Sequence, residues 1–243
     1  GGGVLLSEAE ANLQSFAENH GIPVVTTMMG KGVMPTEHPL HFGMVGNNGQ
    51  PHANLAMNES DLLIMVGARV ADRAVNQPEL ITKNKVLVHM DVDPAEIGKN
   101  AGPTIPLVGD ARHIFEDIAK EAFTCDFHEW VDTLRENRVR MAKKRTPDPG
   151  YVDPAAFIAR LTEKMEDTAV YVADVGQNQI WSCGYAKVKK GKFLTTGGMG
   201  TMGYSIPAAM GAKVAAPDRQ VVAVCGDGSF QMSMMELATM RQH

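Results

Sequence analysis

The stretch QVVAVCGDGSFQM, residues 220–232, predicts an apolar strand that ends in Gly-Asp-Gly, with a helix starting directly after it. Gly226 and Gly228 would let the backbone come close to a phosphate at this turn. Asp227 between them is a candidate metal ligand beside such a phosphate, because carboxylate oxygens bind hard metal ions. One carboxylate does not make a metal site, so other segments should supply the remaining groups.

Two further strands of the second half end in the same way, namely AVYVADVG (169–176) and KFLTTGG (192–198). Each has a glycine at its end and a helical pattern soon afterwards. In open α/β sheets, ligands bind outside the carboxyl ends of the strands, where helix N-termini present free amide groups to anions. The three strand ends together predict one anion-binding edge.

The first half alternates strands and helices too, with strands expected in IPVV (22–25), DLLIMVG (61–67), KVLVHMDVD (85–93) and PLVGD (106–110). Ser7 and Glu10 form a capping box that predicts the first helix, and another helix is expected to begin near Asp110. This alternation predicts an α/β fold with two doubly wound parallel-sheet domains. Prolines, a glycine and charged residues predict a linker over 146–152, which separates a first domain over residues 1–145 from a second over 153–243.

Composition excludes several classes of protein. The chain has 243 residues, a net charge of -5 and no basic stripe typical of a nucleic-acid binder. Cys125, Cys183 and Cys225 are widely spaced, which predicts reduced thiols in the cytoplasm and not a disulfide framework. The first residues lack the features of a signal peptide or a membrane span, so no membrane partner is expected.

The stretch GMGTMG, residues 198–203, matches the dinucleotide-binding pattern G-x-G-x-x-G, and this alternative has to be weighed. Against it, the next strand ends in Gly-Asp-Gly and not in a single acidic residue, and polar Thr195 and Thr196 precede the glycines.

Three stretches, in their residues and their order along the chain, closely resemble thiamine-diphosphate enzymes of the acetolactate synthase (acetohydroxyacid synthase) family. They are DVGQNQIW (174–181), TTGGMGTMGYSIPAAMGA (195–212) and GDGSFQMSMMELAT (226–239). The resemblance continues through GIPVVTTMMGKG (21–32), GARVADR (67–73) and HMDVDPAEIGKN (89–100), so it covers nearly the whole chain. It implies that the chain is a fragment of a catalytic large subunit, without the N-terminal pyrimidine-binding domain and with the diphosphate-binding domain cut short.

The resemblance also implies the cofactor site. Asp227 is then a Mg²⁺ ligand, and the family's asparagine ligand lies beyond His243. Met202 would be wedged between the two rings of the cofactor, and Gly200 would offer a backbone carbonyl to its aminopyrimidine. The full set of implied thiamine-diphosphate contacts is Gly176, Gln177, Asn178, Gly200, Met202, Gly226, Gly228 and Ser229. The catalytic glutamate of the family belongs to the missing domain, so the resemblance implies no catalytic residue here and an inactive chain when alone.

For the central domain the resemblance implies FAD. The matching positions are strand-end glycines, basic side chains for a diphosphate and acids for ribose hydroxyls: Thr27, Met28, Gly30, Gly46, Gly67, Arg69, Arg73, Asp91, Val92 and Asp110. The sequence departs from the family at Ala71, where an aspartate is usual, and at Asn47 and Asn48, where a Met-His pair is usual.

The activity implied is decarboxylation of pyruvate on thiamine diphosphate and transfer of the hydroxyethyl unit to a second pyruvate or to 2-oxobutanoate, the first common step of branched-chain amino-acid biosynthesis. The implied assembly is a homodimer or tetramer of the full-length chain with a small regulatory subunit. Two alternatives remain open: a flavin-dependent oxidoreductase of the pyruvate-oxidase kind and a non-catalytic nucleotide-binding module.

Overall fold

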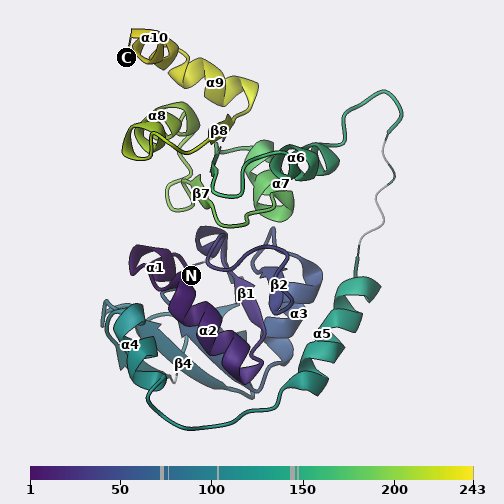
Figure 1. The fold of residues 1–243 in the computed structure, drawn as a ribbon. Coiled ribbons are helices and arrows are strands. Elements are labelled where there is room, and N and C mark those ends of the chain that lie inside the picture. Colours follow the sequence, from purple (N-terminus) through teal and green to yellow (C-terminus); the bar gives the residue numbers. More distant parts are fainter. Residues whose placement is uncertain (72–73, 76, 103, 143–145, 147, 243) are drawn as a thin grey trace. The chain divides into compact units, whose positions relative to one another are not determined.

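The computed structural model describes residues 1–71, 74–75, 77–102, 104–142, 146 and 148–242. The chain divides into two compact units (Figure 1). Unit 1 comprises Gly1–Met34 and His38–Lys144, and unit 2 comprises Pro35–Glu37 and Arg145–His243. In both units every described strand pair is parallel, so the predicted α/β class with parallel sheets is confirmed.

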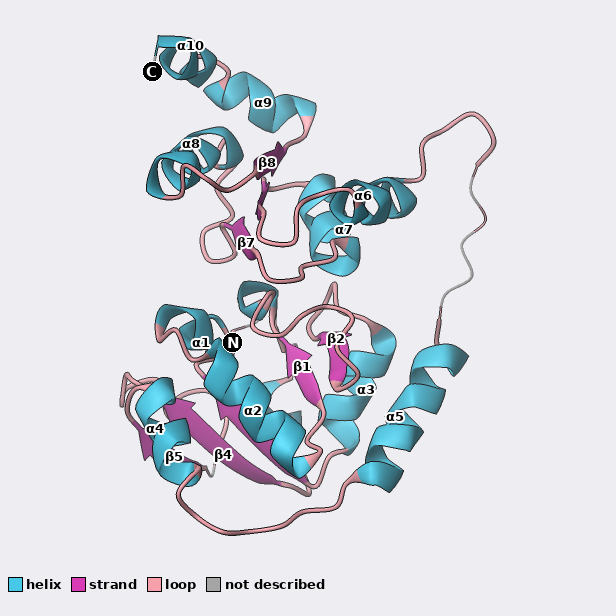
Figure 2. Cartoon of the chain, in the orientation of Figure 1, coloured by secondary structure: helices cyan, strands magenta, loops and turns pink. Residues whose placement is uncertain are grey.

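The strands of unit 1 form two separate parallel sheets (Figure 2). One contains β3 (Leu62–Val66), β4 (Val86–Asp91) and β5 (Ile105–Val108), in that order. The other pairs β1 (Val24–Thr26) with β2 (His41–Met44). The predicted single sheet is therefore divided between β1 and β3 in the described part of this unit.

The helices of unit 1 are α1 (Gly2–Leu6), α2 (Glu10–His20), η1 (Met28–Gly30), α3 (Pro51–Glu59), η2 (Pro78–Leu80), α4 (Ala111–Ile118) and α5 (His128–Arg140). Leu13 of α2 and Phe115 of α4 pack in one core with Val66 and Met90 of the larger sheet. A second core joins Phe42 of β2 to α3 and α5. Burial of apolar side chains on these two faces is the main stabilising term of the unit.

The predicted helix start at Ser7 is wrong, whereas that at Asp110 is confirmed. Ser7 instead follows the short helix α1, where its amide donates to the Gly3 carbonyl, and α2 begins at Glu10 without a side-chain cap. The pattern failed because the glycines before Ser7 already form a helical turn. Asp110 caps α4 by accepting a hydrogen bond from the Arg112 amide at 2.9 Å.

Unit 2 is built on one parallel sheet of β6 (Val170–Ala173), β7 (Lys192–Thr195) and β8 (Val221–Val224), in the order β7-β6-β8. Its helices are α6 (Pro154–Glu163), α7 (Gln177–Tyr185), α8 (Ser205–Ala215), α9 (Asp227–Ser233) and α10 (Glu236–Gln242). The central strand β6 is buried along its whole length. Tyr171 on this strand bonds to Ser182 of α7 at 2.7 Å, which fixes that helix on the sheet.

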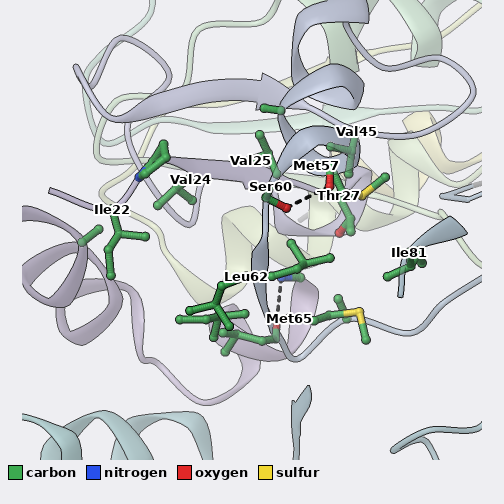
Figure 3. A pocket seen from close by; sticks show the side chains of 18 of the residues that line it. Ile22, Val24, Val25, Thr27, Val45, Met57, Ser60, Leu62, Met65 and Ile81 are labelled. Atoms are coloured by element: carbon green, nitrogen blue, oxygen red, sulfur yellow. Dashed lines mark hydrogen bonds between the residues drawn. The ribbon is translucent and has the colours of Figure 1, made fainter. Parts of the chain in front are cut away.

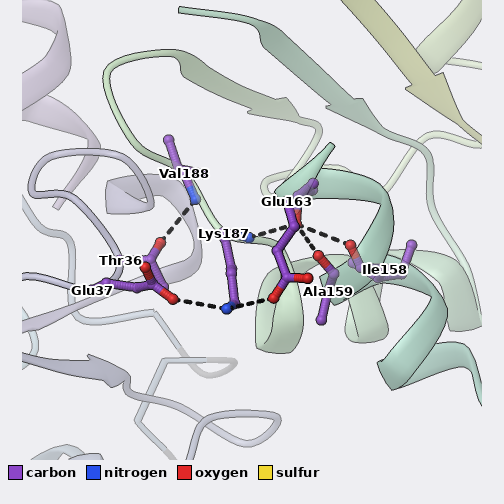
Figure 4. Close-up of polar contacts among 8 residues, drawn as sticks. Thr36, Glu37, Ile158, Ala159, Glu163, Lys187 and Val188 are labelled. Atoms are coloured by element: carbon purple, nitrogen blue, oxygen red, sulfur yellow. Dashed lines mark hydrogen bonds and ion pairs between the residues drawn. The ribbon is translucent and has the colours of Figure 1, made fainter. Parts of the chain in front are cut away.

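A short segment, residues 35–37, belongs to unit 2 and is held there by main-chain and side-chain bonds (Figure 4). The Thr36 amide donates to the Val188 carbonyl at 2.8 Å, and the Val188 amide donates to Oγ1 of Thr36 at 3.0 Å. Lys187 forms ion pairs with Glu37 and Glu163, both at 2.7 Å. Buried Thr162 accepts a bond from the Lys187 amide at 3.0 Å.

Across the described residues, no helix has the length and apolar character that a membrane crossing requires.

Candidate functional site

The carboxyl ends of the three strands of unit 2 lie at one edge, because β7, β6 and β8 run parallel to each other. Gly176 follows β6 and precedes α7, with a φ of 119° that favours glycine. Gly226 follows β8 and precedes α9. Two helix N-termini, with their free amide groups, therefore start at neighbouring strand ends.

Asn178 in the first turn of α7 lies over both of these strand ends. Its Nδ2 donates to the Val175 carbonyl at 3.3 Å. A Cβ built on Gly176 or on Gly226 would lie 3.7 Å from the same Nδ2, in ordinary van der Waals contact, so the amide lies close to both glycines. The Oδ1 of Asn178 is buried and has no hydrogen-bond partner among the described residues. Buried polar atoms are normally paired, so an unpaired acceptor at this edge fits a site that receives a ligand donor or water.

The glycine-rich loop after β7 and the start of α9 come together at the same edge. Met202 is 41% exposed, and its Cε lies 3.3 Å from the position that a Cβ on Gly228 would take. Buried Ser229 donates its hydroxyl to the Val175 carbonyl at 3.2 Å. Met202 thus lies beside the N-terminus of α9 and presents a flexible, partly exposed apolar side chain at the strand ends.

Asp174 organises this edge, although the sequence interpretation quoted it without giving it a role. Its fully buried carboxylate accepts main-chain hydrogen bonds from Val175 at 2.8 Å, Gly203 at 3.0 Å and Ser205 at 2.7 Å. Burial acts to raise the pKa of Asp174, but the bonds from Ser205 and Val175 outweigh it, and the pKa lies below its usual value. The carboxylate thereby fastens the glycine-rich loop and the start of α8 to the end of β6.

Gln179 is a second organising residue that the sequence interpretation missed. Its Nε2 donates to Oγ1 of Thr195 at 2.7 Å, and that hydroxyl donates to the Ala173 carbonyl at 2.9 Å. All three groups lie between α7 and the ends of β6 and β7. The only sequence signal was a polar residue two positions into a helix that was otherwise expected to pack on the sheet.

Asp227, the predicted metal ligand, is exposed and is the first residue of α9. Within the described part of the chain, no three His, Cys, Asp or Glu side chains are grouped so as to hold a metal ion. Asp227 could thus supply one oxygen to a Mg²⁺ that takes its other ligands from a diphosphate and from further groups. Gln177, the first residue of α7, and Gly200, with a φ of 66°, complete the positions predicted in this unit.

The positions predicted for FAD lie at strand ends of unit 1. Gly67 and exposed Arg69 follow β3, Asp91 ends β4 with Val92 after it, and Asp110 follows β5. Asp91 accepts a bond from the Asp93 amide at 3.0 Å, so one of its oxygens is already engaged. Asp110 is engaged as the cap of α4. Arg73 lies outside the described residues.

The other FAD positions follow the smaller sheet. Thr27 caps the 3₁₀ turn Met28–Gly30 by accepting the Gly30 amide at 3.2 Å. Gly46 exchanges two bonds with Asn54, of 2.9 and 3.0 Å. The N-terminal glycines lie close to FAD positions of both sheets. A Cβ on Gly30, after the smaller sheet, would lie 3.2 Å from Gly1, and a Cβ on Gly67, after β3 of the larger sheet, would lie 2.6 Å from the Cα of Gly3.

Two family models match the chain. Residues 1–118 match the central domain of thiamine pyrophosphate enzymes, and residues 174–243 match the C-terminal thiamine-pyrophosphate-binding domain of the same enzymes. The second match begins at Asp174, directly after β6, and includes Asn178, Met202 and Ser229 of the edge described above. A thiamine-pyrophosphate-binding domain is therefore present in unit 2.

Curated relatives give the same result. The chain is 42% identical to the acetolactate synthase large subunit of Corynebacterium glutamicum over 98% of its own length and 39% of that protein. It is 38% identical to the acetolactate synthase large subunit of Lactococcus lactis over 98% of its own length and 42% of that protein. The chain thus spans about two fifths of the length of these relatives. It belongs to the thiamine pyrophosphate enzymes, as a homologue of acetolactate synthase large subunits that carries the central and C-terminal domains.

Proposed function

We propose that this chain is the central and diphosphate-binding part of an acetolactate synthase. The full-length protein would decarboxylate pyruvate and transfer the hydroxyethyl unit to a second 2-oxo acid, giving 2-acetolactate or 2-aceto-2-hydroxybutanoate. The observation that carries the proposal is the convergence of Asn178, Met202 and Ser229 on one sheet edge, where the N-termini of α7 and α9 both begin after a glycine.

The residues of this edge suit a diphosphate. The N-terminal amide groups of α7 and α9 attract anions, and both helices begin after a glycine that keeps the approach open. We assign Gly176, Gln177, Gly226, Gly228 and the hydroxyl of Ser229 to diphosphate contacts. The Asn178 side chain has the donor and acceptor of an amide, so it can bond either to a phosphate oxygen or to ordered water.

Met202 and Gly200 are assigned to the rings of thiamine diphosphate. When bound, this cofactor supplies a thiazolium that accepts the electrons released as a 2-oxo acid loses CO₂. Met202 is partly exposed beside Gly228, where an unbranched, polarizable side chain can support an aromatic ring. Asp174 keeps the loop that carries both residues at the end of β6.

Mg²⁺ and FAD are assigned by family membership together with residue chemistry. Asp227 offers an exposed carboxylate beside the proposed diphosphate site, which is the donor type that Mg²⁺ takes. In unit 1, the strand ends after β1, β3, β4 and β5 offer glycines, Arg69 and carboxylates to a dinucleotide. The proposed domain limits are 1–145 for the FAD-type domain and 153–243 for the diphosphate-binding domain, joined by a linker.

We propose as partners pyruvate, 2-oxobutanoate, further copies of the full-length chain and a small regulatory subunit, in the cytoplasm.

The test is a colorimetric acetolactate assay on the full-length polypeptide that contains this chain, with pyruvate, thiamine diphosphate and Mg²⁺. We expect acetolactate formation that requires both cofactors and proceeds equally with and without oxygen. Acetate formation that requires oxygen would support the flavin oxidoreductase alternative instead. Tight nucleotide binding with no turnover of pyruvate in either atmosphere would support the non-catalytic module.

A further inference from the structure

A cavity of about 230 Å³ lies inside unit 1, between its two sheets (Figure 3). Val24 and Val25 of β1 line one side, and the residues of β3 from Leu62 to Val66 line the other. Its remaining walls are mostly apolar and include Phe16, Phe115 and Leu134. The cavity is partly open to the outside, and since packed proteins leave few apolar spaces larger than a water molecule, a space of this size between two sheets calls for an occupant.

Both strands that border the cavity have an unpaired edge facing it. Among the described strands, β3 pairs with β4 alone and β1 pairs with β2 alone. Toward β4, the Val86 amide donates to the Asp61 carbonyl and the Gly67 amide donates to the Met90 carbonyl, both at 2.8 Å. Successive residues of a strand direct their main-chain groups to opposite sides, so Leu62, Ile64 and Val66 direct theirs away from β4 and toward the cavity.

The same alternation applies to β1. The Val24 amide donates to the Leu40 carbonyl, and the Thr26 carbonyl accepts from the Val45 amide, both at 2.8 Å and both on the β2 side. The amide and carbonyl of Val25 therefore face away from β2. A buried strand edge without partners is costly, since unpaired amide and carbonyl groups lose their bonds to water.

Gly1 lies at one end of this space and already uses the free edge of β3. Its amino nitrogen donates to the Val66 carbonyl at 2.7 Å, and the Gly3 amide donates to the Gly67 carbonyl at 2.9 Å. Burial lowers the pKa of the Gly1 amino group to about 5, although Asp91 acts in the opposite direction. A charged amine is unfavourable in this place, whereas a peptide N–H would bond to Val66 equally well and carry no charge.

We propose that the space between β1 and β3 is a strand position, filled by one extended apolar segment of the same polypeptide that runs parallel to both strands and continues directly into Gly1. With it, the two sheets of unit 1 become one continuous parallel sheet. The bond from Gly1 to Val66 sets the register: the second residue before Gly1 donates to the Ile64 carbonyl and accepts from the Val66 amide. The occupant is apolar because the strand is covered on both faces, which is typical of parallel sheets. The proposal does not depend on the activity proposed above.

Two extended chains test the proposal, each with six residues added before Gly1. One carries the strand-forming segment Thr-Val-Val-Ile-Val-Ala, and the matched control carries Gly-Ser-Gly-Ser-Gly-Ser, which removes the terminal charge equally well. The readout is residue-resolved amide hydrogen exchange. We expect exchange at Val25, Ile64 and Val66 to slow by about tenfold or more in the apolar chain relative to the control. Leu63 and Met65, whose amides face β4, should change less and serve as internal references.

Equal exchange rates at Val25, Ile64 and Val66 in the two extended chains would overturn the proposal. So would protection that appears only as the chain dimerises with rising concentration, because a second copy would then be the occupant. If the apolar extension aggregates, the same segment is added to the unextended chain as a free peptide acetylated at its N-terminus. Slower exchange at the three amides then supports the strand position, and unchanged exchange at saturating peptide refutes it.

Discussion

The carboxylate of Asp174 accepts a hydrogen bond from the main-chain nitrogen of Ser205 at 2.7 Å, across 31 residues of sequence. Through this bond and a second one from Gly203, the end of β6 determines where the glycine-rich loop lies. The proposed cofactor contacts of Gly200 and Met202 belong to that loop, so the buried carboxylate of Asp174 sets the position of both residues.

Replacing Asp174 with asparagine should destabilise unit 2. An amide has one acceptor oxygen where the carboxylate has two, so at least one of the main-chain amides of Val175, Gly203 and Ser205 would lose its acceptor, and the remaining bonds would lose a charged one. We expect a loss of about 1–3 kcal/mol in the free energy of unfolding, measured by urea denaturation at pH 7. Asp218→Asn, the same change at an exposed position of unit 2, is the control and should alter stability by less than about 0.5 kcal/mol.

The same variant has a predicted pH dependence. The pKa of Asp174 is lower in the folded chain than its ordinary value of 3.8, so its contribution to stability is complete above that value and disappears as the pH falls through the folded pKa. The stability difference between the original chain and Asp174→Asn should therefore shrink in acid. A difference that stays constant from neutral pH down to pH 2 would show that the carboxylate's charge contributes nothing.

Local sequence signals predicted those features that a few neighbouring residues determine. The glycine ends of β6 and β8 followed from apolar runs that stop at a turn residue, and the cap at Asp110 followed from a single side chain bonding two residues onward. Asp174 and Gln179 could not be assigned in this way, because their partners lie in other segments of the chain. Nothing in the short sequence around them distinguishes a buried organiser from an ordinary loop or helix residue.

Strand β2 was missed for a related reason. It contains Gly43, which lowers strand propensity, and it forms because its main chain pairs in parallel with β1. His41 is buried in this strand, with a ring nitrogen 3.4 Å from Oγ1 of Thr26. The division of the unit 1 strands into two sheets was equally invisible, since strand pairing is a non-local property.

Thr162 and Lys187 offer a comparison between a buried hydrogen bond and exposed ion pairs. Thr162→Val leaves the Lys187 amide without its acceptor, and we expect it to cost about 1–3 kcal/mol of unfolding free energy. Lys187→Met removes the ion pairs with Glu37 and Glu163 on a partly exposed surface and should cost less than about 1 kcal/mol. Thermal unfolding of the two variants gives the ranking, and a larger loss for Lys187→Met would contradict it.

Alanine substitutions at Gly21 and Gly67 of unit 1 can be compared to separate the energetic cost of backbone strain from that of steric overlap. Both have positive φ, of 52° and 64°, but a Cβ on Gly21 meets nothing within 4 Å, whereas one on Gly67 would lie 2.6 Å from the Cα of Gly3. Gly21→Ala should cost about 1–2 kcal/mol for its left-handed backbone alone. Gly67→Ala should cost roughly 1–3 kcal/mol more, because the backbone of Gly3 has to move. Equal losses in urea unfolding would mean that the contact between Gly3 and Gly67 is not tight in solution.

Asp227→Asn tests the proposed metal ligand in the full-length protein. Asp227 is exposed, and no hydrogen bond or ion pair of its carboxylate is found among the residues that the structure describes, so the change should leave the melting temperature without cofactor within about one degree of the original. Thiamine diphosphate and Mg²⁺ together should raise the melting temperature of the original protein, because ligands that bind only the folded state stabilise it. In Asp227→Asn this rise should be lost at equal concentrations, since a neutral amide is a much weaker ligand for Mg²⁺.

Asp218→Asn is again the control and should keep the full rise. A cofactor-dependent rise that is the same in Asp227→Asn as in the original protein would remove Asp227 from the metal site, and an absence of any rise in the original protein would count against the diphosphate site itself.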